Sequence, residues 1–241
     1  MVVYILLFLL AACASFVQRV TGFGFGIFIM MFLPYIMPSY NEAVALSGLL
    51  SGTTAFLIII RKLRYICWRR MFLILLANIA VSYFVIMHMS SAGGDFLRHC
   101  LGIALILVAL YFIFVEGRLK FSFESRWLQL SLGAISGIMG AMFAMPGPPV
   151  VLYGVNVIED KEKYMATMQA FWLLFNMFYL LFRSSGSYYT SATPQLWLVG
   201  LAGLSVGLFF GAKCFNALDR KMFKRAVYLF MIVSGIVALF G

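Results

Sequence analysis

Two breaks rich in glycine and proline interrupt an otherwise almost continuous apolar sequence. The first is Thr21-Gly22-Phe23-Gly24-Phe25-Gly26, followed by the apolar run 27–33. The second is Met145-Pro146-Gly147-Pro148-Pro149, followed by the apolar run 150–157. Helix-breaking backbone at membrane depth is tolerated only where protein or a water-filled cavity surrounds it. Interrupted apolar segments at matching places in two halves of a chain point to the binding site of a secondary transporter.

The low content of charged residues excludes a soluble fold. Of the 241 residues, 64% are hydrophobic and 11% are charged, whereas soluble domains have about 25% charged residues. Short charged stretches separate apolar runs close to the ~20 residues that cross a bilayer as a helix. The net charge of +10 does not indicate a nucleic-acid partner, because no basic face accompanies a soluble fold. We therefore expect one membrane domain over residues 1–241.

Apolar length and flanking charge predict an all-α chain with two half-helices, one after each break. The first half is predicted to contain residues 2–20, the half-helix 27–37, and the spans 41–60, 71–88 and 99–115. The second half is predicted to contain residues 127–144, the half-helix 150–158, and the spans 164–182, 195–212 and 226–240. Each half is thus an interrupted hairpin followed by three transmembrane helices.

Positive charge sets the predicted orientation. Most Lys and Arg residues lie in the segments 61–70, 116–126, 159–163 and 213–225, which should therefore face the cytoplasm. Each interrupted hairpin returns to the side where it began, so the halves 1–115 and 127–241 run in opposite orientations, as inverted-topology repeats. Both termini are then predicted to lie outside. A constant offset of 121 residues aligns Gly26 with Gly147, Ser15 with Ser136 and Ala45 with Ala166, but few other positions are identical.

The breaks offer the chemistry of an anion site. A half-helix that begins inside the membrane presents free backbone N–H groups and the positive end of its dipole, and an anion is the natural occupant. In the first break, Gly22, Gly24 and Gly26 allow close approach of the backbone. The N–H groups of residues 24–27 are predicted to converge on the ligand.

The second break has fewer donors, because Pro148 and Pro149 have no N–H group. Gly147 and the first residues of the half-helix would supply them there. The alternative for both breaks is purely structural, since glycine in membrane helices also serves close packing and proline also produces kinks.

Polar side chains near the breaks complete the candidate site. Gln18 and Arg19 precede the first break, and Ser47 and Asn176 lie on the helices that follow the two breaks. An intramembrane arginine suggests a functional role, but Arg19 would snorkel to the cytoplasmic surface if its helix crosses nearly the whole bilayer. The hydroxyl and amide groups suit an oxyanion, or else they bond helix to helix.

Other chemistries find no support in the chain. It contains no nucleophile–base pair, metal-ligand spacing or cofactor motif, so we predict no enzyme activity, metal or cofactor. No Asp or Glu lies in the middle of a predicted span. The coupling ion, a proton or sodium, is therefore left open, as is a homodimer.

The first break with Gln18, the second break, Tyr153 and the short basic loops together resemble the sulfite exporter TauE/SafE family of membrane permeases. The resemblance covers nearly the whole chain. It implies an all-helical carrier of two homologous halves in a bacterial inner membrane, moving sulfite, organosulfonates or related small anions. It further implies a ligand region of Gln18, Thr21, Gly22, Gly24 and Gly26 in the first half, and Gly147, Pro148, Pro149 and Tyr153 in the second. The segment 136–140 departs from the fuller glycine run of many relatives. Met145-Pro146 also departs from them, because it stands where they have small residues.

The leading hypothesis is a secondary transporter that binds a small anion between the two half-helix N-termini and alternates access by movement of its halves. A passive anion channel with the same site is the first alternative. A scaffold subunit that transports nothing is the second, but it leaves the paired breaks without a purpose. The expected partners are the small anion and membrane lipids.

Overall fold

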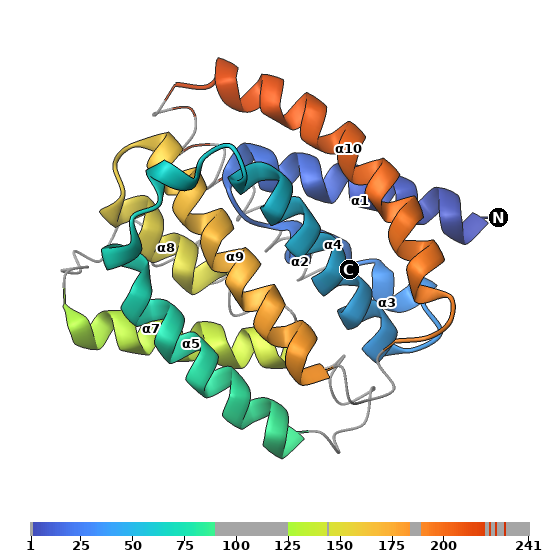
Figure 1. Ribbon diagram of the computed structural model, residues 1–241, viewed down its shortest axis with the longest axis horizontal. Helices are drawn as coiled ribbons and strands as arrows, with labels where there is room; N and C mark the ends of the chain where they lie inside the picture. The colour runs from blue at the N-terminus through green and yellow to red at the C-terminus, as the bar shows by residue number, and fades with distance from the viewer. Residues whose placement is uncertain are drawn as a thin grey trace.

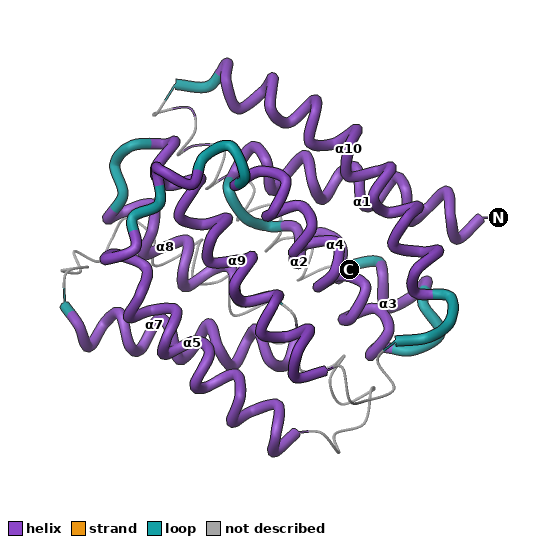
Figure 2. Tube along the Cα trace, viewed as in Figure 1, coloured by secondary structure: helices purple, strands orange, loops and turns teal. Residues whose placement is uncertain are grey.

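The computed structural model describes residues 2–89, 125–143, 145–183 and 189–219, with residues 222, 225 and 229. This part of the chain consists of helices and loops and contains no strand (Figure 1, Figure 2). In chain order the helices are α1 (Val2–Thr21), α2 (Phe25–Met30), α3 (Leu33–Ile36), α4 (Tyr40–Ile59), the 3-10 helix η1 (Leu63–Tyr65), α5 (Trp68–Met89), α7 (Arg126–Phe143), α8 (Gly147–Val157), α9 (Lys161–Arg183) and α10 (Thr193–Ala217).

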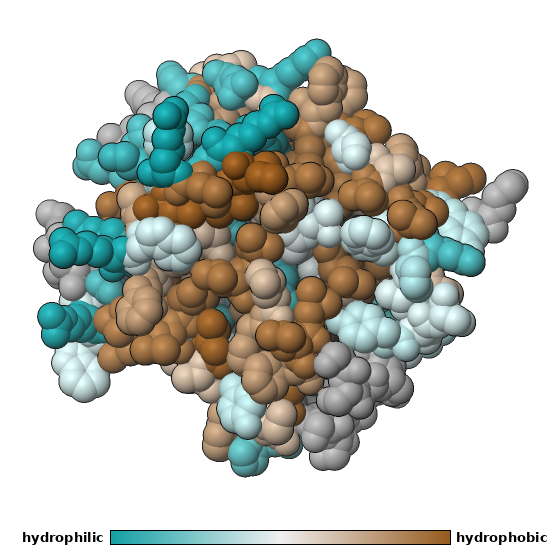
Figure 3. Space-filling model, in the orientation of Figure 1, coloured by the Kyte–Doolittle hydropathy of each residue, from teal (hydrophilic) through white to brown (hydrophobic). Residues whose placement is uncertain are grey.

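Five of the described helices are long and apolar enough to span a membrane, namely α1, α4, α5, α9 and α10. The prediction of an all-helical, multi-pass membrane protein is confirmed. The buried share of the apolar window is 61% in α4 and α9, but only 28% in α1 and α5 and 33% in α10. α4 and α9 therefore form the centre, and the other three helices turn apolar faces outward. Hydrophobic side chains cover much of the face of the molecule seen in Figure 3. The predicted spans 99–115 and 226–240 lie outside the described residues, apart from residue 229.

The half-helix predicted over residues 27–37 is instead two short helices, α2 and α3, separated by a turn at Met31 and Phe32. Pro34 explains the interruption and lies in the first turn of α3. A proline has no N–H to bond the carbonyl four residues earlier, and its ring clashes with that carbonyl. The helix must therefore end near Met30 and restart.

Several other helix bounds also differ from expectation, among them the starts of α5 at Trp68 and of α9 at Lys161. α8 begins at Gly147 rather than at residue 150, with Pro148 and Pro149 inside its first turn. Prolines are tolerated there because the first N–H groups of a helix have no intrahelical partner. α10 continues to Ala217 rather than ending at residue 212. Lys213, predicted to lie in a cytoplasmic loop, is therefore helical.

The helices pack in three pairs. α1 lies along α10, α5 lies along α7, and α4 lies along α9 between these two outer pairs (Figure 1). The short helix α2 packs on α1 and α4, while α8 packs on α7 and α9. Each interrupted hairpin therefore reaches the central pair through its short second arm.

Glycines allow the outer pairs to approach closely. On α10, Gly203 and Gly207 face the backbone carbonyls of Phe8 and Ala12 on α1. On α7, a Cβ placed at Gly133 would lie 2.6 Å from the Ile74 carbonyl oxygen of α5. Small residues at such positions let two membrane helices pack backbone to backbone. The second half of the chain supplies the glycines in both pairs.

Hydrogen bonds add to the α5–α7 contact. The amide Nδ2 of Asn78 donates to the hydroxyl of Ser136 at 2.8 Å, and the hydroxyl of Ser82 donates to the Gly137 carbonyl at 3.0 Å. All of these polar groups are buried, where water does not compete for them. The pair is thus joined by polar contacts as well as by glycine packing.

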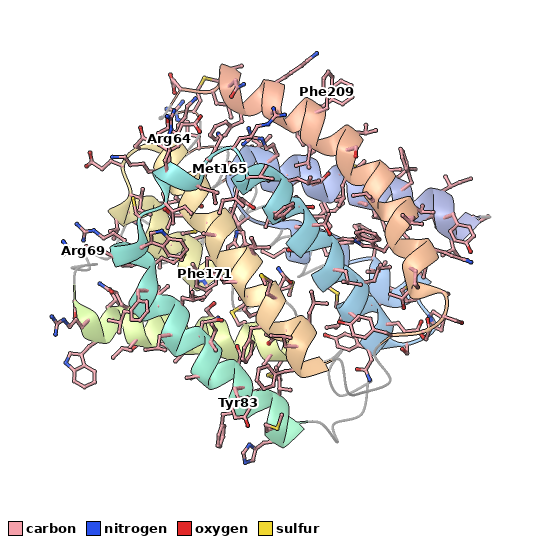
Figure 4. All side chains as sticks on the ribbon, in the orientation of Figure 1. Arg64, Arg69, Tyr83, Met165, Phe171 and Phe209 are labelled. Carbon is pink, nitrogen blue, oxygen red and sulfur yellow. The ribbon has the colours of Figure 1, made fainter. Side chains whose placement is uncertain are left out.

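Basic residues gather at one end of the bundle. The side-chain cations of Arg19, Lys62 and Lys161 each lie 5.0 Å from the ring centre of Phe215 near the end of α10, and Lys62 pairs with Glu162. Figure 4 shows Arg64 in η1, Arg69 at the beginning of α5 and Tyr83 near the other end of α5. The ends of α1, α4 and α10 therefore meet the start of α9 in one charged region.

Candidate functional site

A cavity lies where the two breaks meet. Its empty volume is about 360 Å³, a value that includes open space outside the cavity. Both breaks, α1, α4 and α9 contribute to its wall. The lining residues are Gln18, Phe23, Gly24, Phe25, Gly26, Ile27, Ser51, Met145, Pro146, Gly147, Trp172, Phe175 and Asn176.

The first break is held open by left-handed backbone at two glycines. Gly22 has φ +85° and Gly24 has φ +92°, a region that is costly for residues with a Cβ. The hydroxyl of Thr21 lies 2.9 Å from the carbonyl oxygens of both Val17 and Phe23. It thereby links the last turn of α1 to the break and fixes where the chain turns.

The four residues whose N–H groups were expected to converge, residues 24–27, all line the cavity. Gly24 is the N-cap of α2, and its carbonyl accepts the first hydrogen bond of the helix from Phe28 at 2.9 Å. The N–H groups of Phe25, Gly26 and Ile27 are the first of α2, so they have no partner within the helix. They are the main backbone donors available to a ligand.

The second break is anchored to its neighbours from behind. The hydroxyl of Ser136 donates to the Pro146 carbonyl at 2.6 Å, and Ser136 also accepts the Asn78 amide from α5. Gly147 faces the first break, since a Cβ placed on it would meet the Phe23 ring at 3.5 Å. The residues that follow it, Pro148 and Pro149, provide no N–H group. This side of the cavity therefore contributes shape more than hydrogen-bond donors.

An amide network joins α1, the first break and α9. Nε2 of Gln18 donates to Oε1 of Gln169 at 2.7 Å, and Nε2 of Gln169 donates to the Gly22 carbonyl at 3.0 Å. The indole N–H of Trp172 donates to the same carbonyl at 2.8 Å. The Gly22 carbonyl, which a break would otherwise leave unpaired, is satisfied twice. The network fixes the position of the first break against the central helix α9.

Asn176 connects the central pair beside the cavity. Its Nδ2 donates to the Trp172 carbonyl at 2.8 Å and to the Ser51 hydroxyl of α4 at 3.3 Å. Gly48 and Gly52 of α4 lie against the Asn176 side chain. An amide in this position both holds α4 to α9 and borders the cavity, so the two interpretations of Asn176 from the sequence are compatible.

The structure brings five of the twelve predicted site residues into the cavity wall and leaves seven outside it. Gln18, Gly24, Gly26, Gly147 and Asn176 line the cavity. The remainder comprise four residues that shape or flank the breaks, the buried Ser47 of α4, the buried Tyr153 of α8, and Arg19. The four that shape or flank the breaks are Thr21, Gly22, Pro148 and Pro149.

Arg19 turns away from the cavity. Its guanidinium lies over Phe215, and its aliphatic stem packs against Gly211 of α10. Of the two roles weighed from the sequence, this position matches a side chain that reaches the basic end of the bundle. It does not place the arginine beside the two breaks.

Several lining residues were not predicted. Ser51 lies one turn after Ser47, and Trp172 lies one turn before Asn176, so helical periodicity around the two predicted residues would have found both. Phe175 and Met145 carried no comparable signal, because an apolar residue in a membrane helix is the default. The residues that line the cavity, all within the described part of the chain, include none that is ionisable.

The described residues contain no group of three or more His, Cys, Asp or Glu that could hold a metal ion. The geometry is therefore that of a neutral, partly aromatic cavity with amide, hydroxyl and backbone N–H groups in its wall. Such a wall suits hydrogen bonding to a small polar or anionic ligand within an apolar surrounding.

Comparison with known proteins identifies the family. Neither a curated protein nor a solved structure matched the chain. The family model for the sulfite exporter TauE/SafE matches residues 7–238, nearly the whole chain. The chain therefore belongs to the sulfite exporter TauE/SafE family of membrane transporters.

Proposed function

We propose that this protein is a secondary transporter of small sulfur-containing or organic anions, such as sulfite or organosulfonates. The anion binds in the cavity between the two breaks, and the protein opens this cavity to alternate sides of a bacterial inner membrane. Family membership supports the transporter class. The choice among sulfur-containing anions, and the mechanism, are proposals.

The observation that carries the proposal is the single cavity lined by both breaks. Two breaks far apart in the sequence would have no reason to meet if each served only local packing. The aromatic and aliphatic wall lowers the local dielectric, which strengthens hydrogen bonds to an anion. The anion is held by neutral donors, above all the first N–H groups of α2, because the start of α8 is poor in them.

The proposal includes two inverted repeats, and the packing supports it. At the 121-residue offset, α1 corresponds to α7 and α4 to α9, with ends that agree within three residues. α5 corresponds to α10, which begins four residues and ends seven residues later than the offset gives. The α1–α10 pair then corresponds to the α7–α5 pair, and α4–α9 corresponds to itself. This correspondence between helix pairs is expected if the two halves are related by an axis that passes between α4 and α9.

This packing suggests which parts would move. Each outer pair contains one helix from each half and is joined by close glycine contacts, so each pair is expected to move as a unit. The central pair α4–α9 carries Ser51 and Asn176 beside the cavity. We propose that the outer pairs tilt about this centre, and that both chain termini lie outside, in accordance with the positive-inside rule.

Counterflow in liposomes tests the proposal. Purified protein is reconstituted, the vesicles are loaded with unlabelled sulfite, and entry of labelled sulfite is followed. A carrier accumulates label transiently by exchange, whereas a channel only equilibrates it. Imposed proton or sodium gradients then identify the coupling ion.

The Gly26→Val variant is the test of the site, because its side chain would enter the cavity wall at the start of α2. Ser205→Val on α10 is the matched control, since Ser205 is exposed on the outside of the bundle. Loss of exchange in Gly26→Val alone is the expected result. Full exchange in both variants would remove the first break from the mechanism.

A further inference from the structure

Gln169 has only one orientation that its surroundings allow. One end of its amide lies 3.0 Å from the Gly22 carbonyl oxygen and 3.4 Å from the Met165 sulfur. Both neighbours are acceptors, so this end must be the NH₂ group. Figure 4 shows Met165 on the same helix, α9. The indole N–H of Trp172 can only donate a hydrogen bond, so its contact with the same Gly22 carbonyl agrees with this assignment.

The orientation of Gln169 determines that of Gln18. Oε1 of Gln169 faces Gln18 at 2.7 Å, so Gln18 must present its own NH₂ group there. Oε1 of Gln18 is then left over, and among the described residues it has no hydrogen-bond donor. The side chain is only 1% exposed and lines the cavity. A buried acceptor without a donor is unfavourable.

Gln18, a residue of the cavity wall, therefore brings one acceptor that lacks a partner close to the donors of α2. We infer that Gln18 makes the transporter select small anions that carry a hydrogen-bond donor of their own. Hydrogensulfite fits this requirement and the sulfite dianion does not; a hydroxyalkanesulfonate fits and a plain alkanesulfonate does not. The inference rests on the proposed function and names the ligand class of the same site.

A change in the protonation of a protein side chain does not explain this selectivity. The ionisable side chains on the elements around Gln18 do not line the cavity. They include Tyr4, Cys13 and Arg19 on α1, Tyr40 and Glu42 on α4, Lys161, Glu162, Lys163, Tyr164 and Tyr179 on α9, and Lys213 and Cys214 on α10. A preference for a protonated or hydroxylated anion would then arise from hydrogen bonding at Gln18 and not from a charge change in the wall.

Calorimetric titration of the purified protein with two matched sulfonates tests the inference. 2-Hydroxyethanesulfonate should bind about tenfold or more tightly than ethanesulfonate, since a site with a buried acceptor discriminates against an analogue that lacks the donor. In Gln18→Met the two affinities should agree within about threefold. The control Ser15→Ala, which removes a buried polar group of α1 outside the cavity wall, should retain the full preference.

A second titration, of the unmodified protein with sulfite at different pH values, tests the inference even if Gln18→Met does not fold. Affinity for total sulfite should fall as the pH rises through the second ionisation of sulfite, whereas affinity for ethanesulfonate, singly charged throughout, should not. Equal affinities for the two sulfonates in the unmodified protein would overturn the inference and leave the transport proposal intact. Absence of binding by both sulfonates and by sulfite would overturn both.

Discussion

A matched pair of glycine substitutions separates packing from the binding site. Gly137→Ala and Gly147→Ala add the same methyl group only ten positions apart in the sequence. At Gly137 on α7, the new Cβ would lie 2.6 Å from the carbonyl oxygen of Asn78 and 3.2 Å from the backbone nitrogen of Ser82. At Gly147 the nearest atom is a Phe23 ring carbon at 3.5 Å, an ordinary contact.

The expected loss of stability for Gly137→Ala follows from these distances. The atoms it would meet are backbone, so α5 and α7 must separate by most of an ångström, and overpacking of this kind costs about 1–3 kcal/mol. Separation also stretches the 3.0 Å bond from Ser82 to the Gly137 carbonyl, which contributes about 1 kcal/mol more. A loss of about 2–4 kcal/mol lowers the Tm by roughly 4–15 °C in a chain of this size.

Gly147→Ala should behave in the opposite way. Its thermal stability should stay within about 0.5 kcal/mol of the unmodified protein. Its sulfite exchange, corrected for the amount of folded protein, should fall at least about tenfold, because one methyl group in a small pocket has an effect of that order.

The assays are thermal melting in detergent, followed by size exclusion, and counterflow in liposomes. A melting temperature for Gly137→Ala equal to that of the unmodified protein would refute the close α5–α7 packing. Unchanged exchange by Gly147→Ala would refute the place of the second break in the site.

Three further predictions address the first break, the charge of the site and the orientation. Gly22→Ala should destabilise the protein by about 2 kcal/mol or more, seen as a lower Tm, since its φ is +85° and its Cβ would lie 2.6 Å from the Tyr164 ring. Asn176→Asp keeps the shape of the side chain but adds a negative charge to the cavity wall and removes the Nδ2 donor to the Trp172 carbonyl, so the Tm should fall and anion exchange per folded protein should fall at least about tenfold; equal exchange would contradict an anionic substrate. A cysteine at Ser39 should react with a membrane-impermeant maleimide in intact cells, whereas one at Arg64 should react only after permeabilisation; the reverse pattern would invert the proposed orientation.

Local sequence determined the existence of the helices and the places where they break. Apolar runs of span length bury their own backbone groups only as helices, and the glycine and proline clusters near residues 22–24 and 145–146 interrupt them. The split of α2 from α3 also has a local cause, Pro34, although the uniformly apolar run around it predicts one continuous half-helix. The early start of α8 has the same kind of cause.

The identity of the atoms around the cavity depended on tertiary structure. A membrane helix that is apolar on all sides does not indicate which face meets its neighbours, so the sequence did not decide whether Arg19 turns toward the breaks or toward α10. Packing of α1 on α10 settles this by placing Arg19 beside Phe215 and Gln18 in the cavity wall. The acceptor of Gln18 that lacks a donor follows only from the hydrogen bond between Gln18 and Gln169 and the one between Gln169 and Gly22. These residues come from distant segments, so no single segment of sequence predicts which end of each amide donates.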